Sequence, residues 1–329
     1  MYGFLGLELE SPLVLAPLAG ISDSVSRLLA HEKGAALSYT EMVSAKGLYY
    51  KSPGSEELLV IGPGEGPVGI QIFGSEPDMI SFAAEHLKDR PNAFLDINMG
   101  CPVPKVVKTG AGSALIRNPG RALEILKTAR KACDIYGKSL TVKTRIGFED
   151  EDATNGKGRD FVKMLAQSGV ELIAVHGRTR VQMYHGQSQT AVLAEYREAV
   201  RDSKVAFIAN GDIKDGQSAL EILKMTDADG LMIGRAATGN PWIFDEVRAA
   251  LEGRTDFVRP SVNDRKEMIL REIKANLEYK DEHIAVREMR PSMMAYIKGI
   301  PGAARLKQQL CAAGSLREVE EILWNTSLT

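Results

Sequence analysis

The sequence predicts an α/β fold in which a (β/α)8 TIM barrel is followed by a small all-helical C-terminal domain. Eight short apolar runs rich in β-branched residues occur before residue 240. Amphipathic stretches alternate with them, which is the pattern of repeated strand–helix units around a parallel sheet. Beyond residue 240 the strand-like runs stop and helical spacing continues. We therefore expect two domains, a barrel over residues 1–240 and a helical domain over residues 241–329.

Each predicted strand is a short apolar run, and each predicted helix has apolar positions three and four residues apart. The strands are expected at residues 13–19, 36–42, 68–73, 94–98, 140–144, 172–175, 206–209 and 230–233. The helices between them are expected at residues 77–88, 120–136, 158–168, 191–202 and 218–225. In the C-terminal part, helices are expected at 264–279 and 282–297, after a charged linker at 254–260. Eight strands are the number that closes a barrel.

A doubly wound open sheet is the competing architecture. It usually has fewer strands and places a glycine-rich turn after the first one. Here the first strand ends in Ala16-Pro17-Leu18-Ala19-Gly20, and the sequence contains neither a GxGxxG motif nor a phosphate-binding P-loop. These features favour the barrel.

Composition narrows the class of protein. The net charge is −2, from 41 basic and 43 acidic residues. Any surface that binds nucleic acid must therefore be a local cluster of basic residues. The three cysteines include no CxxC pair, so we expect no disulfide framework and no metal site. The first residues lack the pattern of a signal peptide, and no apolar run approaches the ~20 residues of a membrane span. We expect a cytoplasmic protein without membrane contact.

Cys101 is the candidate catalytic residue. It follows the predicted strand 94–98, beside Gly100 and before Pro102. A residue just beyond a strand's carboxyl end points into the ligand mouth of a barrel, where a thiol can serve as an acid. A lone cysteine can also be an inert core residue, so this position matters because of its neighbours.

Polar residues gather at the ends of the other strands too. Gly211 and Gly234 precede helices whose first amides can hold a phosphate, and Arg235 adds positive charge. Lys143 can stabilise negative charge on a conjugated ring, while Gln71 and Asn98 offer amide hydrogen bonds to its edge. Taken singly these residues could be turns, solvated charges or ordinary core groups. Together they predict a site for a flavin.

Eight motifs, in order along the chain, closely resemble the signatures of the tRNA-dihydrouridine synthase family. That family comprises flavin enzymes that reduce selected uridines in tRNA. The similar segments are residues 15–20, 69–74, 96–102, 110–115, 142–145, 175–179, 210–213 and 233–235. The first has Leu18 where a methionine is common. The tail at 287–303 looks most like the bacterial B-type branch, except that Arg290-Pro291-Ser292 replaces a basic residue and a histidine.

The resemblance implies a barrel that binds FMN and takes electrons from NADPH. It implies hydride delivery to C6 of uracil and protonation of C5 by Cys101. The residues expected to bind the flavin are Pro17, Leu18, Ala19, Gln71, Lys143, His176, Asn210, Gly211, Asp212, Gly234 and Arg235. No stable protein partner is implied.

Transfer RNA is the expected partner, and the C-terminal domain its expected binding module. Residues 287–307 hold five basic residues against one acidic residue. Arg287 and Arg290, three apart on a predicted helix, would share a face toward phosphates. The other residues expected near substrate or RNA are Asn98, Lys105, Arg145 and Arg178.

Two other functions fit parts of this pattern. One is an FMN-dependent reductase or dehydrogenase of a free pyrimidine, which would not need a basic helical tail. The other is a catalytically inactive RNA-binding barrel, against which the intact Cys101 and Lys143 argue.

Overall fold

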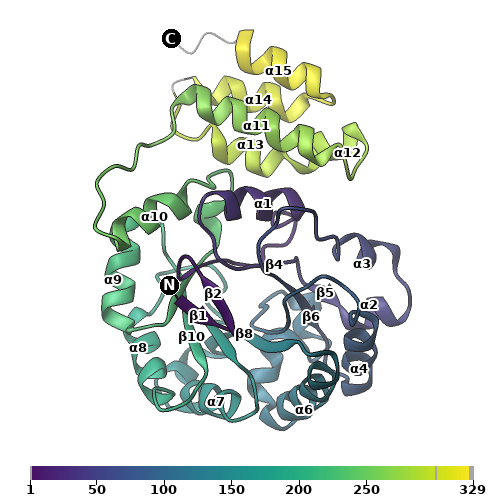
Figure 1. The fold of residues 1–329 in the computed structure, drawn as a ribbon, viewed down its shortest axis with the longest axis vertical. Helices are drawn as coiled ribbons and strands as arrows, with labels where there is room; N and C mark the ends of the chain where they lie inside the picture. The colour runs from purple at the N-terminus through teal and green to yellow at the C-terminus, as the bar shows by residue number, and fades with distance from the viewer. Residues whose placement is uncertain (1, 301, 326–329) are drawn as a thin grey trace.

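A computed structural model describes residues 2–300 and 302–325. Its centre is a barrel of eight parallel strands in the order β3-β11-β10-β9-β8-β7-β6-β4 (Figure 1). The pairing of Val14 with Leu37 bridges β3 and the chain entering β4, which closes the ring. The barrel strands are β3 (Leu13–Leu15), β4 (Ser38–Tyr39), β6 (Val68–Phe73), β7 (Phe94–Met99), β8 (Ser139–Gly147), β9 (Leu172–Thr179), β10 (Ala206–Asn210) and β11 (Gly230–Ile233). The predicted TIM barrel is confirmed.

A helix follows each barrel strand and covers the outside of the sheet (Figure 1). These helices are α1 (Ser24–Glu32), α2 (Ala45–Tyr49), α4 (Pro77–His86), α6 (Pro119–Tyr136), α7 (Lys157–Ala166), α8 (Thr190–Ala199), α9 (Gly216–Thr226) and α10 (Ile243–Leu251). Shorter elements lie in the loops: β5 (Val43–Ser44), α3 (Pro53–Glu57), α5 (Pro104–Val107), η1 (Gly112–Arg117), η2 (Asp150–Ala153) and η3 (Arg235–Ala237).

The barrel interior changes from apolar to polar along the strands. An N-terminal hairpin, β1 (Tyr2–Phe4) and β2 (Leu7–Leu9), packs Phe4 and Leu9 with Phe94 and other inward side chains. Gly69 on β6 leaves the space that the Phe94 ring fills. Because β-strand side chains alternate, Phe94, Asp96 and Asn98 point the same way. The apolar layer thus supports the polar residues nearer the strands' carboxyl ends.

The C-terminal domain is a separate cluster of helices that lies beyond α1 and α10 (Figure 1). It comprises α11 (Val262–Asn276), α12 (Glu282–Glu288), α13 (Arg290–Tyr296), α14 (Ala303–Ala312) and α15 (Leu316–Asn325). Ser261 caps α11 by accepting a hydrogen bond from the Asp264 N–H, which satisfies one of the free amides of its first turn.

The division between the domains lies later than residue 240. Helix α10 buries Ile243, Phe244 and Val247 in the hydrophobic core of the barrel, as the helix after the eighth strand should. The expected boundary at 240/241 would cut this helix from the barrel. The packing instead divides the chain between α10 and α11, where the charged linker was expected.

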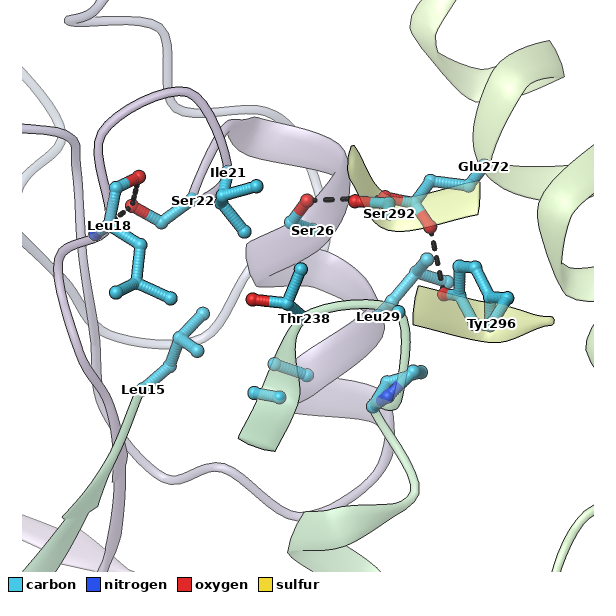
Figure 2. Close-up of a pocket in the computed structure, with 14 residues that line it drawn as sticks. Leu15, Leu18, Ile21, Ser22, Ser26, Leu29, Thr238, Glu272, Ser292 and Tyr296 are labelled. Carbon is cyan, nitrogen blue, oxygen red and sulfur yellow. Dashed lines mark hydrogen bonds between the residues drawn. The ribbon is translucent and has the colours of Figure 1, made fainter. Parts of the chain in front are cut away.

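Helix α1 joins the two domains. Its Val25 and Leu29 are buried in the cluster formed by the C-terminal helices, and each such side chain stabilises the contact by about 1.5–3 kcal/mol. Beside them, Ser26 and Tyr296 donate hydrogen bonds to the buried carboxylate of Glu272 (Figure 2). Apolar packing and a buried polar cluster therefore fix the helical domain on the barrel.

Candidate active site

A cavity of about 910 Å³ opens at the carboxyl ends of the barrel strands. Its size is at the upper end of the range for small-molecule and cofactor sites. Cys101, Asn98, Arg145 and every residue expected to contact a flavin line it: Pro17, Leu18, Ala19, Gln71, Lys143, His176, Asn210, Gly211, Asp212, Gly234 and Arg235. The structure thus brings together residues from the ends of six of the eight barrel strands and Gln71 from within a seventh strand, β6.

The loop after β7 presents Cys101 to this cavity. The Asn98 side-chain oxygen accepts hydrogen bonds from the N–H groups of Gly100, at 3.1 Å, and Cys101, at 2.9 Å. The hydroxyl of Ser113 donates to the Cys101 carbonyl at 2.9 Å. Gly112 lies at φ 60°, close to Cys101, where a Cβ would be both strained and crowded. These bonds hold the thiol at the cavity wall.

The Cys101 side chain is protonated at neutral pH in this setting. Burial raises the pKa of its thiol, although the Val103 N–H and the charges of Arg145 and Lys143 oppose that rise. A thiol with a raised pKa keeps its proton available for donation. The site therefore suits Cys101 as an acid better than as a nucleophile.

Lys143 and Arg145 project from β8 into the cavity. Lys143 donates a hydrogen bond from Nζ to the Asn210 side-chain oxygen at 3.0 Å, and burial lowers its pKa to about 8. Arg145 donates from Nε to the Gly100 carbonyl at 2.8 Å, and burial lowers its pKa to about 10. Within the described residues, neither cation forms an ion pair with a carboxylate.

Asp212, just after β10, forms ion pairs with two arginines. Its carboxylate accepts from Arg178, at 2.9 Å, and from Arg235, at 3.1 Å. Burial acts to raise the pKa of Asp212, but the Ser188 N–H and the Arg178 guanidinium outweigh it and the pKa is lowered. Burial and the surrounding cations lower the pKa of His176, so its imidazole is neutral.

This distribution of charge fits an anionic ligand. Lys143, Arg145 and Arg235 line the cavity, and Arg178 lies beside the lining residue His176. Asp212 forms ion pairs with only two of these four cations. The hydroxyl of Ser188, another lining residue, is buried and has no hydrogen-bond partner among the described residues. Cations in excess over nearby carboxylates, together with a free hydroxyl, are what a phosphorylated cofactor would use.

The residues expected at the RNA are in different environments. Lys105 is exposed on α5, beside the Cys101 loop. Arg178 is only 2% exposed and donates to the carbonyls of His185 and Gly186 as well as to Asp212. It organises the loop after β9, and the structure does not place its charge at the surface.

Arg287 and Arg290 also differ from the expected shared face. Arg287 is exposed on α12 and lines a groove between the helical domain and α1. Arg290 begins a new helix, α13, and its half-buried guanidinium donates to the Ala313 carbonyl at 3.3 Å. Helix α12 ends at Glu288, so one continuous helix does not carry both arginines.

The sequence pattern missed Tyr184 and Ser188, which lie in the loop after β9 and line the cavity. The Tyr184 ring lies 5.7 Å from the guanidinium carbons of both Arg145 and Arg235. Irregular loops carry no periodic signal, so only their position after a strand of known inward residues could have pointed to them.

The fold and site define a (β/α)8 barrel enzyme with a cofactor cavity at the mouth and a helical domain beside it. Residues 14–327 match the family model described as "Dihydrouridine synthase (Dus)". The chain belongs to the dihydrouridine synthase family, and it is an oxidoreductase of that class. The resemblance found in the sequence motifs is thereby confirmed.

Curated relatives agree with this assignment. A protein of Rickettsia bellii named "Probable tRNA-dihydrouridine synthase" is 33% identical over 92% of this chain and 90% of its own length. A "tRNA-dihydrouridine synthase B" of Vibrio vulnificus is 34% identical over 88% of each chain. A solved 2-naphthoyl-CoA reductase complex is similar in fold, with a TM-score of 0.59 and 12% identity. That match covers 77% of this chain and about half, 51%, of the other.

Two features are absent from the part of the chain that the structure describes. No helix among the described residues is long and apolar enough to cross a membrane. No group of three or more histidine, cysteine, aspartate or glutamate side chains among these residues could hold a metal ion.

Proposed function

We propose that this protein reduces specific uridines in tRNA to 5,6-dihydrouridine, with FMN held in the barrel-mouth cavity and NADPH as reductant. The observation that carries the proposal is the position of Cys101, a buried thiol at the wall of a cation-rich cavity in a chain of this family. Saturating a 5,6 double bond requires a hydride at one carbon and a proton at the other.

The residues around the cavity suit the flavin by charge and hydrogen bonding. Gly234, Arg235 and Ser188 would hold its phosphate, and Gln71 and Asn210 would bond its polar edges. Lys143, largely charged below pH 8, would stabilise negative charge on the ring. When bound, the flavin supplies the hydride that reaches C6 of uracil.

Cys101 completes the reduction at the other carbon of the double bond. Its thiol gives a proton to C5 as the hydride reaches C6, so the S–H bond breaks, a C–H bond forms and a thiolate remains. The nearby charges of Arg145 and Lys143 stabilise that thiolate, which water then reprotonates. The Asn98 side chain holds the loop in place during this transfer.

The helical domain supports RNA rather than a free base as the substrate. Arg287 lies exposed in the groove between the two domains, and Lys105 is exposed beside the Cys101 loop. A target base has to leave its stack to enter the cavity, as enzymes that act on bases require. The backbone around it would then lie across these exposed cations.

The proposal is tested by incubating the purified protein with NADPH and tRNA that lacks dihydrouridine. Mass spectrometry of the digested RNA should find dihydrouridine, and the bound chromophore released by heat should be FMN. Formation of dihydroorotate or dihydrouracil from the free bases, with unchanged tRNA, would instead support the small-pyrimidine alternative.

A further inference from the structure

A chain of buried side-chain hydrogen bonds links Asp96, inside the barrel, to the loop that carries Cys101. The Gln71 Nε2 donates to the Asp96 carboxylate at 2.7 Å, and Asn98 Nδ2 donates to Gln71 Oε1 at 2.8 Å. The Asn98 Oδ1 then accepts from the Cys101 N–H at 2.9 Å. All three of these hydrogen bonds are buried.

Asp96, at the inner end of this series of hydrogen bonds, sets the direction of each bond. An ionised carboxylate only accepts, so it requires Gln71 to present its NH₂ group. The Gln71 oxygen is then turned toward Asn98 and requires the Asn98 NH₂. That choice leaves the Asn98 oxygen facing the two backbone N–H groups of the Cys101 loop. Rotating the side-chain amide of Gln71 or Asn98 by half a turn would place two donors or two acceptors against each other.

The surroundings of Asp96 favour its role as an acceptor. The hydroxyl of Thr141 donates to its second oxygen at 2.5 Å, and its side chain is fully buried. Burial raises the pKa of Asp96 to about 6, with the two hydrogen bonds and Lys143 opposing that rise. The carboxylate is therefore mainly ionised above neutral pH, with a donor on each oxygen.

We propose that Asp96 is a positioning residue, which sets the orientation of the Gln71 and Asn98 amides and thereby holds the Cys101 loop and thiol in place. Its role in turnover rests on the function proposed above. A buried carboxylate is costly, and the neighbouring interior layer at Phe94 and Val14 is apolar. The hydrogen-bonded connection from Asp96 to Cys101 runs through Gln71 and Asn98.

Alkylation of Cys101 by iodoacetamide tests this role independently of catalysis. The parent protein carries Cys133→Ala and Cys311→Ser, so that Cys101 is its remaining thiol. Asp96→Ala should loosen the loop and raise the alkylation rate by about five- to tenfold, the factor expected for losing one or two hydrogen bonds. Reoxidation of the reduced protein by tRNA should slow, while reduction by NADPH is retained.

A reciprocal pair of variants separates orientation from general damage. Gln71→Glu places a second carboxylate against that of Asp96 and should also speed alkylation of Cys101. Adding Asp96→Asn supplies an NH₂ donor to the new carboxylate, so the double variant should return to within about twofold of the parent. Thr141→Val is the matched control, because it removes the other bond to Asp96 and leaves the one to Gln71.

Each outcome decides the question. Parent-like alkylation in both Asp96→Ala and Gln71→Glu, or no rescue in the double variant, would overturn the positioning role. If Asp96→Ala does not fold, the Gln71→Glu and double variants give the answer alone. If the alkylation pattern holds but the parent fails to reduce tRNA, the proposed function fails and the positioning of Cys101 stands.

Discussion

The hydroxyl of Ser26 on the barrel helix α1 donates to the carboxylate of Glu272 in the helical domain, at 3.3 Å (Figure 2). Tyr296 donates to the same carboxylate at 2.8 Å. Burial raises the pKa of Glu272 to about 7, and the nearby charge of Asp23 adds to the rise. The junction between the domains therefore contains a carboxyl group that keeps its proton to a higher pH than an ordinary glutamate does.

Stability should consequently fall as pH rises through the range in which this group titrates. A folded-state pKa of about 7 against an ordinary 4.5 means that the folded protein binds the proton more tightly. The stabilisation is fully present below pH 4.5 and is lost as pH rises through about 7, an effect on the order of 3 kcal/mol.

Glu272→Gln isolates that contribution. The amide accepts from Tyr296 and donates to Ser26 without a charge. The unfolding free energy should therefore fall less between pH 5 and pH 8 in Glu272→Gln than in the parent protein. Urea denaturation at both pH values measures the difference. An unaltered pH dependence would show that Glu272 is not the titrating group.

Cys101→Ala should bind flavin and accept electrons from NADPH as before, because the thiol is needed only for the proton to C5. Turnover on tRNA should fall by about 10²–10⁴-fold, the usual contribution of a general acid. Cys133→Ala, a change on the buried face of α6, is the control and should keep its rate. Normal tRNA turnover in Cys101→Ala would refute the acid role.

Arg287→Ala and Arg290→Ala should have different effects. Loss of exposed Arg287 should weaken tRNA binding and reduce the slope of log K against log salt by about one. Loss of Arg290, which bonds the Ala313 carbonyl, should lower stability by about 1 kcal/mol and leave the slope unchanged. Binding titrations over a salt series distinguish them, and equal slopes for Arg287→Ala and the parent would remove Arg287 from the footprint.

Flavin affinity should depend on the charge of Lys143. Its pKa of about 8 means that it loses its proton as pH rises through 8, so affinity for an anionic ligand should then fall. The decrease should be at most about tenfold per pH unit between pH 8 and 9. Lys143→Met should bind more weakly at pH 7 and show a flat profile. Fluorescence titration of FMN measures both, and a steep profile in Lys143→Met would contradict this assignment.

The barrel could be predicted because its strands are continuous apolar runs. Strands β6 and β11 have the bounds expected from the sequence, at 68–73 and 230–233. Strands β3 and β4 are much shorter than the expected 13–19 and 36–42, because the chain leaves the sheet at their polar or proline-containing ends. Helix α10 was not expected as part of the barrel, since only its packing shows which core it joins.

The candidate site could be predicted wherever a residue's position on a strand, or just beyond the end of one, sets its direction. Cys101, Lys143 and Asn210 are at the cavity for this reason. The environments of the arginines were harder to predict, because a long side chain can reach solvent or a buried carbonyl from the same backbone position. Arg178 and Arg290 both turn to protein carbonyls, which no spacing rule reveals.

Anaerobic single-turnover oxidation tests the central claim most directly. The protein is reduced with NADPH without oxygen and mixed separately with unmodified tRNA, free uridine and orotate, while flavin absorbance is followed. The account predicts rapid reoxidation by tRNA alone, with an equal amount of dihydrouridine in the RNA. Reoxidation by a free pyrimidine, with tRNA left unmodified, would contradict it.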